Sequence, residues 1–135
     1  MKHMFQKESI SWSGRIAETE GGARFFRNTI VRMLLVFGTL PLLVSVLLLA
    51  YFIRSTDGTV VLHYNVYFGV DLIGTWWQAY FLPMFGLIFF IGNILLSRRL
   101  YATSERIAAY LSLFSSVLMN ASIGVAVFFV CFINY

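Results

Sequence analysis

Three long apolar runs without a charged residue constrain the fold of this chain more than any other feature of its sequence. They extend over residues 33–53, 72–97 and 107–135. Because an α-helix rises about 1.5 Å per residue, about 20 apolar residues cross a hydrocarbon core of about 30 Å. Each run reaches that length. We therefore predict an all-α integral membrane protein whose three transmembrane helices span residues 31–53, 75–97 and 107–133.

The composition agrees with this class. Of the 135 residues, 59% are hydrophobic and 12% are charged, which is outside the usual balance of soluble proteins. Residues 1–28 carry mixed charge without a steady helical period, so we predict a poorly ordered cytoplasmic tail, with a surface-lying helix over residues 9–17 as the alternative. Residues 29–135 then form a single membrane domain. A signal peptide in the first run is disfavoured, because the 32 preceding residues are too many for an n-region.

The Lys and Arg residues predict the orientation of the helices. With three spans, the N-terminal segment and the loop over residues 97–107 lie on one side, and together they carry nine Lys and Arg; the loop over residues 54–77 carries Arg54 alone. Cytoplasmic loops retain such residues, so the N-terminus is predicted inside and the C-terminus outside. The nine are Lys2, Lys7, Arg15, Arg24, Arg27, Arg32, Arg98, Arg99 and Arg106.

The outer loop between the first two helices has a strand period. Residues 59–68 alternate between two faces and are rich in β-branched and aromatic side chains, which predicts a strand along the outer membrane surface. The face toward lipid or the helix ends has Val60, Leu62, Tyr64, Val66 and Phe68. The opposite face has Val61, His63, Asn65 and Tyr67. We predict that the strand ends at Phe68 and that a bend through residues 69–74 follows.

His63, Asn65 and Asp71 are the candidate binding residues of this loop. Two interpretations stay open: these side chains hold the loop together, or they bind a peptide, a lipid headgroup or a partner subunit. One His with one or two carboxylates is a poor ligand set, so we predict no metal and no cofactor. Lipid-headgroup chemistry at His63 and Asp71 is the enzymatic alternative.

The second helix has a marked beginning. Residues 75–78, Thr-Trp-Trp-Gln, have the form of a capping box, in which the first and fourth side chains bond reciprocally to the backbone. Trp76 and Trp77 fall at headgroup level, where indole rings are favoured, and serve as interface anchors. Kinks are predicted at the two prolines inside the spans, Pro41 and Pro83.

Small and polar residues recur at every fourth position of the third span and form a helix-packing face. They are Ser112, Ser116, Asn120 and Gly124. Such a face lets another backbone approach closely in lipid. It packs either against the first or second helix or against another copy or subunit. Asn93 and Asn120 lie at different depths, so we do not expect them to pair.

Groups for catalysis or ion transport are scarce in this sequence. No ionisable Asp, Glu, Lys or Arg lies near the centre of a span, which argues against a pump or an ion-coupled transporter. No hydrolase, metalloprotease or phosphate-loop motif is present. The positive charges flank the apolar runs, so they indicate topology and no nucleic-acid partner. We predict a non-enzymatic protein whose partners are the bilayer and other membrane subunits or a second copy.

The phrase "LHYNVYFGVDLIG", residues 62–74, resembles a phrase in small uncharacterised bacterial inner-membrane proteins of about this length. More distantly, His63, Asn65, Asp71 and the following "FLPMFGLIFF" resemble a domain of unknown function found in membrane proteins that include an immunity protein against a sporulation-delay toxin. The resemblance covers about residues 33–97. It implies a bacterial inner-membrane protein, and His63, Asn65 and Asp71 are the positions that match the outer-loop pattern of those proteins.

The predicted function follows from these features. We expect an accessory or scaffold subunit of the bacterial inner membrane that binds a partner through the outer loop and the third helix. The alternative is an immunity or signalling protein that recognises an extracytoplasmic peptide.

Overall fold

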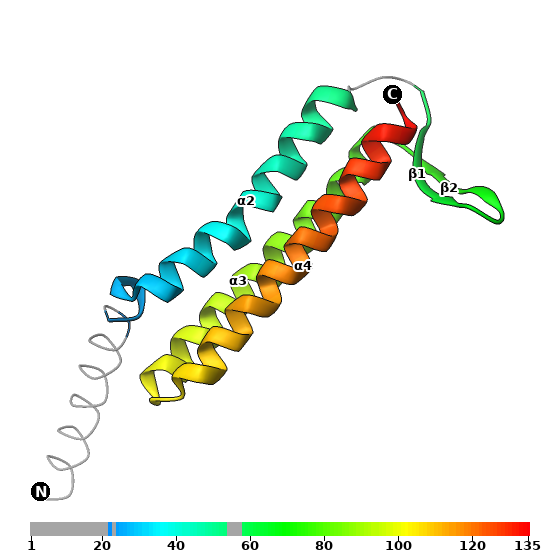
Figure 1. The fold of residues 1–135 in the computed structure, drawn as a ribbon. Coiled ribbons are helices and arrows are strands. Elements are labelled where there is room, and N and C mark those ends of the chain that lie inside the picture. The colour runs from blue at the N-terminus through cyan, green and yellow to red at the C-terminus, as the bar shows by residue number, and fades with distance from the viewer. Residues whose placement is uncertain (1–21, 23, 54–57) are drawn as a thin grey trace, which may run out of the picture.

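Three long helices lie side by side, and a two-stranded hairpin projects from one end of them (Figure 1). The computed structural model describes residues 22, 24–53 and 58–135. Of the predicted tail over residues 1–28, residues 1–21 and 23 lie outside the described residues, and so does the alternative surface helix over residues 9–17. The elements in chain order are α2 (Thr29–Phe52), β1 (Val60–Asn65), β2 (Gly69–Gly74), the 3₁₀ helix η1 (Trp76–Tyr80), α3 (Phe81–Ala102) and α4 (Arg106–Ile133).

The prediction of three helices long and apolar enough to span a membrane is confirmed. They have 24, 27 and 28 residues when η1 is counted with α3. The second helix ends at Ala102 and not at the predicted residue 97. Arg99 lies in its last turn, where a cation interacts favourably with the helix dipole, so the arginines extend this helix beyond the apolar run.

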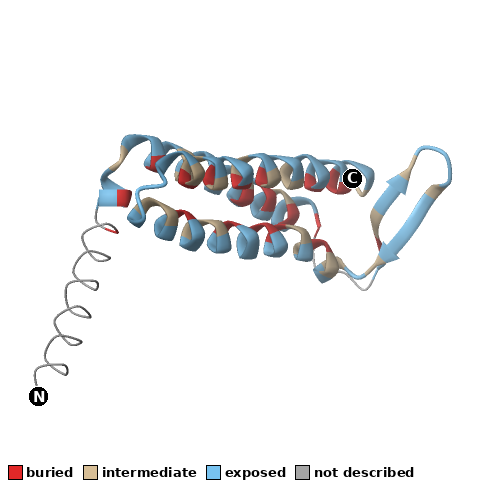
Figure 2. Cartoon of the chain, turned by 90° about the horizontal axis from the view of Figure 1, so that it is seen from below, coloured by how far each residue is buried: buried red, intermediate tan, exposed pale blue. Residues whose placement is uncertain are grey.

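α4 is the central helix of the bundle. It packs along both α2 and α3, whereas α2 and α3 contact each other over a short stretch. Buried residues lie on the sides of the helices that face one another (Figure 2). The outward faces carry large apolar side chains that are exposed, including Val36, Leu47, Phe85, Leu111 and Phe132. Soluble monomers rarely expose apolar surface on this scale, so the bundle has the surface of a membrane protein.

The three helices meet most closely around Asn120, in the middle of α4. The Asn120 side chain is fully buried, and its Nδ2 donates to the Gly38 carbonyl of α2 at 2.8 Å. On the other side, a Cβ at Gly86 of α3 would lie 2.9 Å from Asn120 Oδ1 and 2.8 Å from Ile123 Cδ1. A Cβ at Gly38 would lie 2.7 Å from Cε2 of Phe90. Two glycines therefore permit the distance that the Asn120 hydrogen bond needs.

The folded body begins earlier than predicted. Residues 24–27 are helical, and the Phe25 side chain is fully buried, with its ring 5.5 Å from that of Tyr101. Asn28 caps α2, because its Oδ1 accepts from Ile30 N at 2.9 Å. Its Nδ2 donates to the Tyr110 hydroxyl at 3.0 Å. Phe25 packs in an apolar cluster with residues of all three spanning helices, including Val31 and Leu113. The packed part of the chain therefore includes residues 24–28, which the sequence analysis assigns to the tail.

The two prolines lie in different helical positions. Pro41 is inside α2, as predicted. Pro83 is the third residue of α3, because η1 and not α3 forms the preceding turn. The first N–H groups of an α-helix have no partner within the helix, so the proline ring costs no hydrogen bond there. The kinks expected at Pro41 and Pro83 stay predictions.

Replacement of Gly86 by Ala tests the close approach of the three helices. The added methyl group meets Leu42, Asn120 and Ile123, so Gly86→Ala is expected to destabilise the bundle by about 1–3 kcal/mol. Gly92→Ala, in the same helix, is the control, since its Cβ meets nothing within 4 Å. The measurement is denaturant unfolding of the protein in detergent micelles followed by circular dichroism. Equal stability of the two variants would contradict the packing described above.

Candidate functional site: the outer hairpin

The loop between the first two spanning helices is an antiparallel hairpin. β1 and β2 pair from Val60 opposite Gly74 to Asn65 opposite Gly69, with an irregularity at His63. The prediction of one strand to Phe68 and a bend through residues 69–74 was wrong, because the chain turns at residues 66–68 and residues 69–74 form the second strand. Two local features make this turn. Asn65 Oδ1 accepts from Tyr67 N at 2.9 Å, and Gly69 has a φ of 77°, which glycine adopts without strain.

His63 and Asp71 link the two strands on one face of the hairpin. Nδ1 of His63 and Oδ1 of Asp71 are 2.7 Å apart, so the ring N–H can donate to the carboxylate. The two side chains are 61% and 42% exposed. An exposed pair of this kind contributes about 0.2–1 kcal/mol to stability. It also fixes the imidazole ring, which leaves Nε2 as a directed donor or acceptor for an outside group.

Asn134, at the end of α4, clamps the hairpin to the bundle. Its Oδ1 accepts from Val61 N at 2.9 Å, and its Nδ2 donates to the Val61 carbonyl at 2.7 Å. The same Nδ2 donates to the Val130 carbonyl of α4 at 2.8 Å. The amide thus occupies the place that a neighbouring strand would take beside Val61. Asn134 is not among the residues predicted from the sequence, because nothing near it in sequence indicates a contact 73 residues away.

The join between β2 and the second helix is tight. Gln78 Oε1 accepts from Thr75 N at 2.9 Å, as predicted for the capping box, although the helix that follows is the 3₁₀ helix η1. A Cβ at Gly74 would collide with the same Gln78 oxygen and would lie 2.6 Å from Leu62 Cδ1. Trp76 is partly buried, and Trp77 is half-exposed beside Phe81, with ring centres 5.3 Å apart. Both indoles lie at the hairpin end of the bundle.

The tip of the hairpin is apolar and almost fully exposed. Val66, Tyr67 and Phe68 are 84%, 90% and 84% exposed. The hairpin projects sideways from the end of the bundle, across the direction of the helices, in both ribbon views (Figures 1 and 2). No third strand pairs with the sheet in the described part of the chain, so the outer edge of β2 is open.

The packing face of the third span lies inside the bundle. Asn120 donates to α2, and Ser112 Oγ donates to Asn93 Oδ1 of α3 at 2.9 Å. Ser116 is fully buried, and Gly124 lies beside Pro41 and Ser45 of α2, with ordinary van der Waals spacing for an added Cβ. The structure thus supports the interpretation that this face packs against the other two helices. Asn93 and Asn120 have separate partners.

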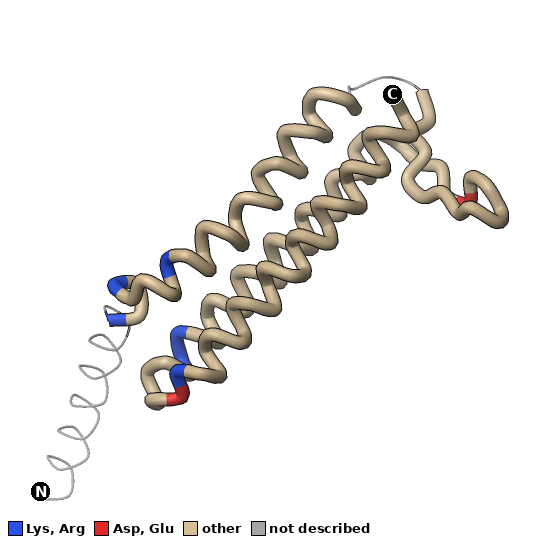
Figure 3. The backbone as a smooth tube through the Cα atoms, in the orientation of Figure 1, with Lys and Arg blue, Asp and Glu red and all other residues tan. Residues whose placement is uncertain are grey.

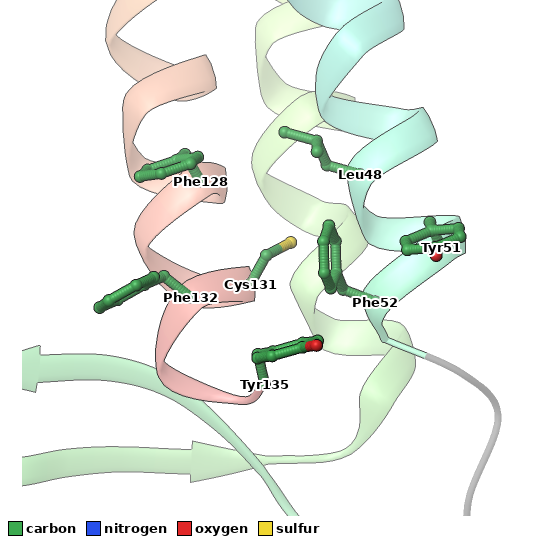
Figure 4. Close-up of a pocket in the computed structure, with 7 residues that line it drawn as sticks. All are labelled: Leu48, Tyr51, Phe52, Phe128, Cys131, Phe132 and Tyr135. Atoms are coloured by element: carbon green, nitrogen blue, oxygen red, sulfur yellow. The ribbon is translucent and has the colours of Figure 1, made fainter.

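An apolar groove of about 410 Å³ opens between α2 and α4 near the hairpin (Figure 4). The Cys131 sulfur points across it toward α2 (Figure 4). Its other walls are Leu48, Tyr51, Phe52, Phe128, Phe132 and Tyr135. These side chains include no carboxylate, His or Lys that could act as a general base, and no two of them could bind a metal ion together. The groove is therefore suited to apolar contact and not to a reaction.

The charged residues mark the two ends of the molecule. Within the described residues, every arginine lies at the end opposite the hairpin, and Asp71 lies on the hairpin (Figure 3). The arginines are Arg24, Arg27, Arg32, Arg98, Arg99 and Arg106. No group of three His, Cys, Asp or Glu side chains in that part of the chain is placed to hold a metal ion.

Comparison of the chain with family models, with curated proteins and with solved structures finds no match.

Removal of the Asn134 amide tests the clamp. Asn134→Ala loses both bonds to Val61, each of which contributes about 0.5–1.5 kcal/mol, so amide hydrogen exchange in β1 is expected to accelerate. Asn134→Asp is a second test, because it puts a carboxylate oxygen where Nδ2 faces the Val61 and Val130 carbonyls, and it should accelerate exchange in β1 as well. The measurement is hydrogen exchange by mass spectrometry in micelles. Unchanged exchange across residues 60–65 in Asn134→Ala would show that the clamp does not hold the hairpin.

Proposed function

We propose that the protein is a non-enzymatic component of a bacterial inner membrane, acting as an accessory or scaffold subunit that binds another membrane protein through the outer hairpin. The clamped hairpin is the observation that carries this proposal. A two-stranded hairpin alone is marginally stable in water, yet this one is fixed to the bundle by Asn134 and braced by the His63–Asp71 pair. A loop that only joins two helices needs no such construction.

The charge distribution supports the proposed orientation. The arginines at the end opposite the hairpin favour the cytoplasmic side for that end, which leaves the hairpin and the C-terminus outside. A partner that meets the hairpin would then be another membrane protein with an extracytoplasmic surface.

The hairpin, and not the third helix, is the partner surface in this proposal. Ser112, Asn120 and Gly124 lie against α2 or α3, and Ser116 is fully buried, so this face is not available to a second protein. On the hairpin, by contrast, His63 and Asp71 are exposed and held in a fixed relation by their 2.7 Å contact. Their oriented polar atoms can hydrogen-bond a partner at little cost in side-chain entropy.

Recognition of an extracytoplasmic peptide, as in an immunity or signalling protein, is the second candidate. The open outer edge of β2 favours it, because an extended peptide can add to a sheet edge through backbone hydrogen bonds. In that case the side chains beside the edge select the sequence of the peptide.

Gentle detergent extraction of the tagged protein from bacterial membranes tests the first candidate. A stoichiometric complex is expected for the unaltered chain, and the double variant His63→Ala, Asp71→Ala should lose the partner because its recognition groups are removed. Thr103→Ala is the control, as an exposed position at the opposite end of the bundle.

Recovery of a lone monomer, or of a complex unaffected by the double variant, would contradict the scaffold proposal. Peptide recognition predicts a different result. A peptide that adds its backbone to the edge of β2 should slow amide exchange in β2. The double variant should change which peptides bind.

A further inference from the structure

The exposed tip of the hairpin is separate from the His63–Asp71 pair that is proposed above to bind the partner. Val66, Tyr67 and Phe68 follow one another in the turn and are the three most exposed large apolar residues of the described chain apart from Tyr135. Burial of apolar surface is favourable wherever water can be excluded, so a tip of this kind indicates a contact with something apolar.

The direction of the hairpin indicates what that contact is. The hairpin starts where the three apolar helices end and runs sideways across their direction (Figures 1 and 2). If the helices cross a bilayer, the hairpin then extends along its surface, at the end that also holds Trp76 and Trp77. Tyr and Trp are enriched at this level, because a ring can enter the acyl region while its polar atom stays hydrated.

Charge narrows the kind of lipid contact further. Residues 58–74 hold no Lys or Arg, and their one acidic side chain, Asp71, is paired with His63. Attraction to anionic headgroups therefore has no source in the hairpin, and apolar burial is the remaining attraction. The turn itself suits the membrane interface, since Asn65 already satisfies the Tyr67 N–H.

We infer that the tip Val66-Tyr67-Phe68 inserts into the boundary between headgroups and acyl chains of the outer leaflet and holds the hairpin flat on the membrane. The polar pair His63 and Asp71 then stays at the water side of the surface, available to a partner. The insertion goes beyond the proposed function and does not depend on a partner, because lipid alone supplies the contact.

Spin labelling of the purified full-length protein in phosphatidylcholine vesicles tests this inference. In a Cys131→Ala background, one label is placed at Tyr67→Cys, one at Trp77→Cys as the interface reference, and one at Glu105→Cys as the water reference at the opposite end. Collision with oxygen, which concentrates in the acyl region, and with a nickel chelate, which stays in water, reports the depth of each label.

The label at Tyr67→Cys is expected to resemble Trp77→Cys, with an oxygen-to-nickel ratio several-fold above that at Glu105→Cys. Addition of phosphatidylglycerol should leave the ratio unchanged. A ratio equal to that at Glu105→Cys would overturn the inference. Protection from both reagents would overturn it too, since a protein contact or a second copy would then cover the tip.

Phe68→Cys provides a second label at the tip, should the first variant fold poorly. Because these vesicles contain no partner, the depth result is separate from the co-extraction result. Failure of the scaffold proposal would leave the insertion intact, and a water-exposed tip would leave the His63–Asp71 partner surface intact.

Discussion

The hydrogen bond from Asn120 of the central helix α4 to the Gly38 carbonyl of α2 is the contact on which the bundle depends. In a bilayer the lipid tails are as apolar as the helices, so apolarity gives helices no reason to associate. Helix association in lipid must therefore come from close packing and from polar contacts, which contribute roughly 0.6–2 kcal/mol per polar contact. Here the 2.8 Å bond to α2 and the bare backbone of Gly86 on α3 bring all three helices to one point on α4.

The position of the hairpin depends in turn on α4. Its central place in the bundle fixes its C-terminal end, and Asn134 at that end holds Val61 of β1 by two hydrogen bonds. The hairpin is thus attached to the best-packed element of the protein and not only to the ends of its own neighbouring helices. A surface fixed in this way can present His63 and Asp71 to a partner in a constant orientation, which is the basis of the proposed function.

The sequence predicts the spanning helices well and the contacts between distant segments poorly. Uncharged runs report helix length in a membrane directly, and spacing by four on α4 correctly indicated a packing face. The hairpin was missed because alternation continues from β1 into the turn, while the irregular pairing at His63 breaks the period in β2. Phe25, Asn28 and Asn134 were missed because their partners lie about 73–82 residues away.

In the proposed orientation the hairpin and the arginines occupy opposite sides of the membrane, and thiol labelling of spheroplasts tests this arrangement. In a Cys131→Ala background, single cysteines replace the exposed Gly58, beside the hairpin, and the exposed Thr103, beside the arginines. A membrane-impermeant maleimide should label Gly58→Cys in intact spheroplasts and Thr103→Cys only after permeabilisation. The reverse pattern would place the hairpin in the cytoplasm and contradict the proposed orientation.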